Sequence, residues 1–274
     1  MNYTSHTIKY IIKNLLYILP FAFIPAVFFS LSVSQEAVKS VLDTLFSGSP
    51  KESFWNVFQA ISIFNFASWD TVLSGIVGMV AIVLCVAMLT AFLEKHMRIG
   101  KRTLNGVFSK VNDNIMSTLG LGIVFLGIYE VWAVLFSALG YLVTQIPNVA
   151  LVYVLLSIVY LGMHFVLLYA LSIFYLWLPC MQITGFRISE ALRYSYHLVA
   201  PIQMNIVLSQ WGFIMLSEAL IAAAVVLVES AIVSFVVIVV LYTIMILVYC
   251  IRMHVIYFDR AEIDRADLNK YNFR

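Results

Sequence analysis

Long apolar runs without a charged side chain alternate with short polar segments along the chain. Residues 14–35, 71–93 and 230–251 form three such runs, of 22, 23 and 22 residues. Each is close to the ~20 residues that a helix needs to span ~30 Å of hydrocarbon. A fourth run, residues 131–186, has 56 residues, which is the length of two spans joined at the polar break 145–148.

This pattern predicts an all-α, polytopic membrane helix bundle with six transmembrane helices. We expect a single domain over residues 1–258, followed by a short cytoplasmic tail, 259–274, that forms a solvated helix. The six predicted spans are residues 14–34, 71–93, 117–143, 149–178, 202–228 and 231–256.

The composition excludes a water-soluble globule. Hydrophobic residues make up 63% of the chain and charged residues 11%, against about 45–50% and about 25% in soluble domains. A soluble fold of this composition would expose large apolar patches, which soluble monomers avoid.

Lys and Arg residues predict the orientation in the membrane. With six spans, 14 of the 16 fall on one side, and only Lys39 and Lys51 fall on the other. The positive-inside rule then places both termini in the cytoplasm. The first run also resembles a signal peptide, but its 22 residues exceed the 7–15 of a signal-peptide core, so we predict a retained span.

The segments that precede the first, third and fifth spans resemble one another. Residues 5–10 and 189–194 both follow the pattern Ser-x-x-aliphatic-basic-Tyr, and residues 104–115 carry apolar side chains at spacings of three and four. Such segments form interfacial helices whose apolar face lies on the membrane. Two interpretations stay open: three repeats of an interfacial helix plus a helical hairpin, or the basic amphipathic ends common to polytopic proteins. Pro201 is expected to separate the third interfacial helix from its span.

The outer segment 35–70 is predicted to lie in the membrane interface, because it is rich in aromatic residues. An apolar stripe on residues 38–45 predicts one helix, and Ser49-Pro50-Lys51-Glu52 resembles the capping box of a second. The segment is either a lid over an outward opening or a connector that lies on the membrane.

Glu130, His164 and Glu218 are ionisable residues at similar depth in three predicted spans. Ionisable groups inside hydrocarbon usually face the bundle interior and are often functional. One hypothesis is a shared proton site, as in a proton-coupled carrier or permease component. The alternative is structural, with these side chains hydrogen-bonded across helices.

The basic stretch between the second and third spans predicts contacts with anionic lipid headgroups on the cytoplasmic side. Nucleic acid is a less suitable partner, because the stretch is short and flanked by membrane. The predicted lipid contacts are Lys95, Arg98, Lys101, Arg102 and Lys110.

Motifs of known catalytic sites are missing from the sequence, including His-Glu-x-x-His, Gly-x-Ser-x-Gly and the phosphate-binding loops. The three cysteines lack metal-ligand or redox spacing. We therefore expect no enzyme activity, no cofactor and no metal.

The segment from Leu178-Pro179 through residues 186–199 resembles a group of bacterial six-span proteins. Its Ser-x-Ala-Leu-Arg-x-Ser-x-x-Leu-Val pattern is similar to that of YciC-like proteins and of the membrane domain beside some glycerophosphodiester phosphodiesterases. YesL-like proteins have a similar proline and amphipathic link. The resemblance covers about 20 residues and implies an all-helical protein of a bacterial plasma membrane.

Two functions are consistent with these patterns. The first is a non-catalytic accessory or lipid-interacting membrane protein, serving a partner such as a transporter. The second is a small carrier that uses the buried Glu and His residues.

Overall fold

The structure, a computed structural model, describes residues 3–47, 50–64, 66, 68–228 and 230–268. Within these residues, six helical stretches are long and apolar enough to cross a membrane, which confirms the prediction of an all-α bundle with six candidate spans. The spans are α1 (Tyr3–Ser32), α4 (Trp69–Ile99), α5 (Val107–Thr144), α6 with α7 (Val149–Ser172 and Trp177–Thr184), α9 (Gln203–Leu227) and α10 (Ala231–Arg260). The shorter elements are α2 (Gln35–Phe46), α3 (Phe54–Ile61), α8 (Ile188–Val199) and the 3-10 helices η1 (Ala200–Ile202) and η2 (Ala266–Leu268).

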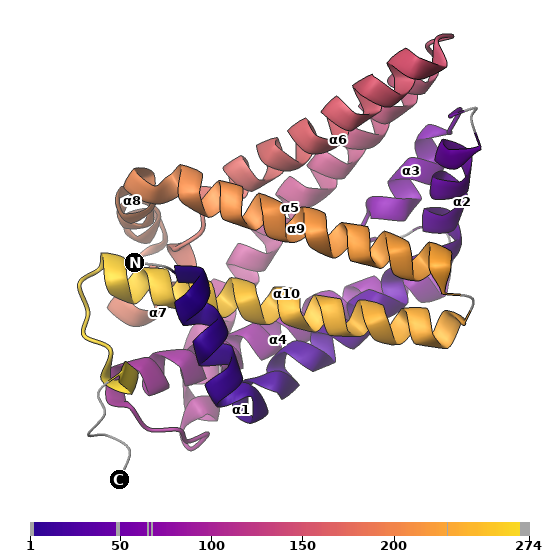
Figure 1. Cartoon of the computed structure of the whole chain (residues 1–274). Coiled ribbons are helices and arrows are strands. Elements are labelled where there is room, and N and C mark those ends of the chain that lie inside the picture. Colours follow the sequence, from indigo (N-terminus) through magenta and orange to yellow (C-terminus); the bar gives the residue numbers. More distant parts are fainter. Residues whose placement is uncertain (1–2, 48–49, 65, 67, 229, 269–274) are drawn as a thin grey trace.

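The helices converge at one end of the molecule and diverge toward the other (Figure 1). Both described ends of the chain, the α4–α5 link and the α7–α8 link lie at the convergent end, which we call the basic end. The α2 and α3 helices and the α5–α6 turn lie at the opposite end. The first helix packs against the last, since α1 contacts both α10 and α4.

The main apolar core lies at the basic end. It contains buried side chains from the last turns of α4, from residues 175–180 and from the end of α10. Residues 251–258 of α10 are buried without exception, so this part of the helix is enclosed on all sides. A smaller cluster, centred on Phe58 and Trp132, joins α3 to α5 and α6 at the opposite end.

Two glycines define the tight link between α4 and α5. Gly100 ends α4 with φ 77°, and Gly106 precedes α5 with φ 78°. Both lie in the left-handed region that glycine adopts without steric penalty. The link therefore reverses the chain in a few residues and brings the basic residues on its two flanks together.

Of the three segments predicted to form interfacial helices, only the one before α9 is a separate helix. α8 is distinct from α9, and η1 with Pro201 lies between them, as predicted. α1 and α5 instead run unbroken from the corresponding segments into their spans. The difference follows from the proline, because neither α1 nor α5 has one at the corresponding junction. The three-fold repeat stays a prediction.

The outer segment forms the two helices expected from its pattern, but its second cap is a different residue. Ser53 caps α3, its hydroxyl accepting from the Asn56 amide at 3.1 Å. Lys51 and Glu52 precede the helix, and Ser49 lies outside the described residues. The predicted capping box at residues 49–52 is therefore wrong, because the helix begins one turn later, after Ser53.

The tail, residues 259–274, was expected to form a solvated helix. In its described part, residues 259–268, no such separate helix is present. α10 continues to Arg260, and η2 then packs against α4. The Arg265 and Asp267 side chains pair at 2.7 Å with only 6% and 5% of their surface exposed. Two of the alternating charges of this segment thus form a buried local pair, while Glu262 and Asp264 stay exposed.

Candidate functional site

His164 and Glu218, two of the three predicted intramembrane residues, meet in the structure. His164 Nε2 lies 3.1 Å from Glu218 Oε1, which joins α6 to α9. The Tyr160 hydroxyl donates to Glu218 Oε2 at 2.5 Å, so a tyrosine completes the contact. Tyr160 lies four residues before His164, and this helical spacing was the only sequence signal for it.

The hydrogen bonds define where the His164 proton sits. Its Nδ1 lies 2.7 Å from the Tyr160 carbonyl oxygen, which can only accept, so Nδ1 carries a hydrogen. One further proton is then shared between His164 Nε2 and Glu218 Oε1. With that proton present the pair is either an imidazolium with a carboxylate or an imidazole with a carboxylic acid, and loss of the proton leaves an imidazole with a carboxylate.

Aromatic rings surround the imidazole, whereas the carboxylate is more open. The His164 ring lies 4.8 Å from the Trp132 ring and 4.6 Å from the Tyr160 ring, measured between centroids. The His164 side chain is 5% exposed and the Glu218 side chain 36%. The contact is therefore closed on the α5 side and partly open at Glu218.

Glu130 has different partners. Its carboxylate accepts from Ser62 Oγ at 2.9 Å and from the amides of Ile63 and Phe64 at 3.0 and 3.4 Å. These groups follow the last turn of α3, so Glu130 joins the outer segment to α5. The structure thus brings together two of the three predicted residues and gives the third a separate role.

Three of the five predicted lipid contacts line a cavity of about 330 Å³ at the basic end. Lys95, Arg98 and Lys110 line it, together with Glu94, whose side chain is 5% exposed. Lys110 Nζ lies 2.5 Å from Glu94 Oε2, and Arg98 lies 3.5 Å from Oε1. Lys95 donates to the carbonyl of Asn105.

Charge and exposure suit this cavity to an anionic group. Three cations and one carboxylate leave it with an excess of positive charge. Arg98 and Lys110 keep 60% and 45% of their side-chain surface exposed despite pairing with Glu94. Ile99 in the lining and Phe108 nearby on α5 are exposed apolar side chains. Lys101 and Arg102, the other two predicted contacts, are exposed in the link and outside the lining.

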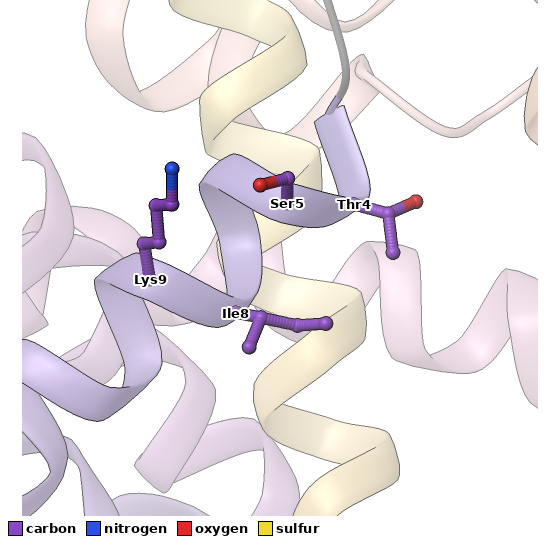
Figure 2. Close-up of a pocket in the computed structure, with 4 residues that line it drawn as sticks. All are labelled: Thr4, Ser5, Ile8 and Lys9. Atoms are coloured by element: carbon purple, nitrogen blue, oxygen red, sulfur yellow. The ribbon is translucent and has the colours of Figure 1, made fainter.

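A second hollow, of about 370 Å³, lies at the start of α1 (Figure 2). Thr4, Ser5, Ile8 and Lys9 line it, and all four belong to α1. Within the described part of the chain no other element contributes a side chain to this lining, so these residues define no convergent binding geometry.

Among the residues described, no group of three or more His, Cys, Asp or Glu side chains is arranged to hold a metal ion. The comparisons with known proteins supply no further guide: no protein-family model, curated protein or solved structure matches this chain.

Proposed function

We propose that this chain is a non-catalytic membrane protein that binds anionic lipid headgroups at its basic end and serves there as an accessory to another membrane protein. The single observation that carries the proposal is the cavity lined by Lys95, Arg98 and Lys110. The resemblance of residues 178–199 to bacterial six-span proteins supports a bacterial plasma membrane as its location. The distribution of basic residues supports cytoplasmic termini.

The position of the cavity suits a lipid headgroup. α4 ends at Ile99, and the three cations lie in its last turns and in the first turn of α5. Long basic side chains at the end of a span reach the phosphate level while their stems stay in apolar surroundings. Glu94 pairs more closely with Lys110, at 2.5 Å, than with Arg98, at 3.5 Å, so Lys95 and Arg98 are the better placed to meet a phosphate from solvent or lipid.

Enrichment of anionic lipid around the protein tests this proposal. We expect the parent protein, in phosphatidylcholine nanodiscs with a small fraction of phosphatidylglycerol, to retain phosphatidylglycerol preferentially when lipids are counted by mass spectrometry. The double variant Lys95→Gln/Arg98→Gln should weaken that preference by about fivefold for each charge removed. Each basic side chain contributes about 1 kcal/mol to the binding of anionic lipid near the membrane surface.

Lys39→Gln/Lys51→Gln is the matched control, because it removes the same charge at the opposite end from exposed positions. Equal enrichment in the two double variants would reject the cavity as the lipid site. A reporter fused after residue 274 should respond from the cytoplasm, and a reporter near residue 48 from the exterior.

A second candidate function, a proton-coupled carrier, rests on the contact between His164, Glu218 and Tyr160. A proton shared between an imidazole and a carboxylate can respond to pH or to a passing cation. Infrared difference spectra between acidic and alkaline buffer should then contain a carboxyl C=O band that is lost in Glu218→Gln. Glu130→Gln is the control, because Glu130 belongs to another set of contacts. Absence of a titrating band would remove the carrier function.

A further inference from the structure

Arg252 is buried at the basic end without an acidic partner. Only 7% of its surface is exposed. Its Nη2 donates to the Ser209 hydroxyl on α9. None of the ion pairs formed by the described residues includes Arg252. A guanidinium held away from water without a counter-charge is strongly unfavourable, so a buried arginine inside a membrane protein normally has an anionic partner.

Hydrogen-bond donors with unused capacity lie near Arg252. Its own Nε is buried and has no hydrogen-bond partner among the described residues. The Gln210 amide nitrogen and the Tyr175 hydroxyl are buried beside each other, and neither has another partner among those residues. Gln210 follows Ser209, which accepts from Arg252, and Tyr175 packs against Tyr249, three residues before Arg252. Donors from three segments therefore lie near one another.

A break in the fourth span brings Tyr175 to this place. α6 ends at Ser172 and α7 begins at Trp177, with turns between them, although the sequence predicts one continuous span. The Tyr175 ring packs edge-on against the Tyr249 ring of α10, with centroids 5.3 Å apart. The Tyr249 hydroxyl is likewise buried without a partner. Interrupted helices in membrane proteins commonly lie beside ligand sites, because irregular backbone is tolerated where it lines one.

The depth of Arg252 corresponds to the headgroup level at the basic end. Twenty-one residues separate it from the start of α10 at Ala231. At 1.5 Å per residue this is about 32 Å, close to the ~30 Å of the hydrocarbon layer. A phosphate at the membrane surface therefore lies at the same height as the guanidinium.

We propose that Arg252, Gln210 and Tyr175 bind an oxyanion inside the basic end, namely a phosphate group from an anionic lipid or from a free ion. The guanidinium supplies the positive charge and directional N–H donors that suit phosphate oxygens. The amide and the phenol supply uncharged donors. This site does not rest on the cavity at the α4–α5 link, with which it shares no residue.

Binding of inorganic phosphate, together with analysis of retained lipid, tests the proposal and separates the two sources. The full chain is purified in uncharged detergent and titrated with phosphate at constant ionic strength, with calorimetry and the unfolding temperature as readouts. Saturable binding of phosphate identifies a free anion. One phospholipid per chain that survives delipidation identifies a lipid.

Arg252→Gln should weaken either ligand by at least roughly tenfold, since a charged hydrogen bond contributes more than the 1.4 kcal/mol that equals one factor of ten. Arg193→Gln, which removes the same charge from an exposed position on α8, should leave binding unchanged.

Gln210→Glu provides a test that does not depend on the stability of the arginine variant. It places a carboxylate of nearly the same shape beside Arg252, so this internal anion should abolish ligand binding and raise the unfolding temperature of the ligand-free protein. The proposal is overturned if the parent protein binds neither phosphate nor a tightly held phospholipid. It is also overturned if Arg252→Gln and Gln210→Glu bind as the parent does.

Discussion

The two ends of this bundle differ in how much apolar packing accompanies their hydrogen bonds. At the basic end, α1, α4 and α10 enclose a large apolar core. At the opposite end the α5–α6 hairpin diverges from that core (Figure 1). In the most apolar part of α4, 56% of the residues are buried, against 17% in that of α5. Apolar side chains can face lipid without penalty, so apolar character alone does not specify which helices meet.

Hydrogen bonds join helices at both ends, for example Tyr10 to His96 at the basic end, but at the opposite end they act beside a much smaller apolar cluster. Besides the bonds of Glu130, the Tyr129 hydroxyl donates to the Ile61 carbonyl at 2.6 Å, and the Tyr153 hydroxyl donates to the Leu45 carbonyl at 2.5 Å. These bonds join the outer segment to α5 and α6. The comparison indicates that a large apolar core adds to the hydrogen bonds at the basic end, whereas at the opposite end a few polar side chains account for more of the packing.

The largest expected effect is at the basic end. Phe92 is fully buried in the main core, so Phe92→Ala leaves a cavity there. Such substitutions cost about 3–5 kcal/mol in soluble proteins. We expect a loss near the lower limit, because the transfer of the side chain from water is absent in lipid. Unfolding in mixed micelles measures it, with Phe108→Ala, 74% exposed, as the control that should change little. Equal losses in the two variants would contradict a packed core.

A smaller and more local effect is expected for Glu130. Glu130→Leu removes the acceptor of the Ile63 and Phe64 amides and should release the end of α3 at a cost of about 1–3 kcal/mol. Hydrogen exchange at these two amides should therefore be at least roughly tenfold faster, with exchange in α4 unchanged. Glu130→Gln keeps an acceptor oxygen and should exchange much as the parent does. Slow exchange in Glu130→Leu would mean that other contacts hold the outer segment.

The smallest expected effect is at Trp132. Its indole nitrogen donates to the Met163 carbonyl at 2.8 Å, and its ring covers His164. Trp132→Phe loses the bond and keeps most of the ring packing, so we expect a loss of about 0.6–1.7 kcal/mol. Unfolding in mixed micelles is again the measurement, and Trp55→Phe, 48% exposed, is the control. A loss as large as that of Phe92→Ala would show that the two ends do not differ in the way described.

Much of the fold follows from the sequence because lipid imposes a simple rule on length and polarity. Six charge-poor runs predicted the six candidate spans, and Pro201 predicted the boundary between α8 and α9. The sequence analysis missed the break at residues 173–176, because that stretch is uniformly apolar. The next proline along the chain, Pro179, lies inside α7 and does not mark the break. The local signals there are those of a continuous helix, and only tertiary contacts account for the turn.

The candidate sites were harder to predict than the fold. The position of a polar residue along a span indicates how deep its side chain lies in the membrane, but not which side chains it contacts. Glu130, His164 and Glu218 were grouped by their similar depth, yet only His164 and Glu218 belong to helices whose polar faces meet. Glu130 faces the outer segment instead, and a sequence pattern carries no information on that choice. Arg252 was read as one more residue of the basic side, since nothing near it in the sequence reveals that α9 and the α6–α7 break enclose it.

The contact between α1 and α10 has a consequence for biogenesis. These two helices are the first and the last of the bundle to leave the ribosome, and residues 251–258 of α10 fill the middle of the main core. During synthesis α1 and α4 must therefore wait in the membrane with their core-facing surfaces uncovered until nearly the whole chain has been inserted. Assembly of the basic end therefore follows the insertion of α10, and until then lipid can cover the apolar faces of α1 and α4 without penalty.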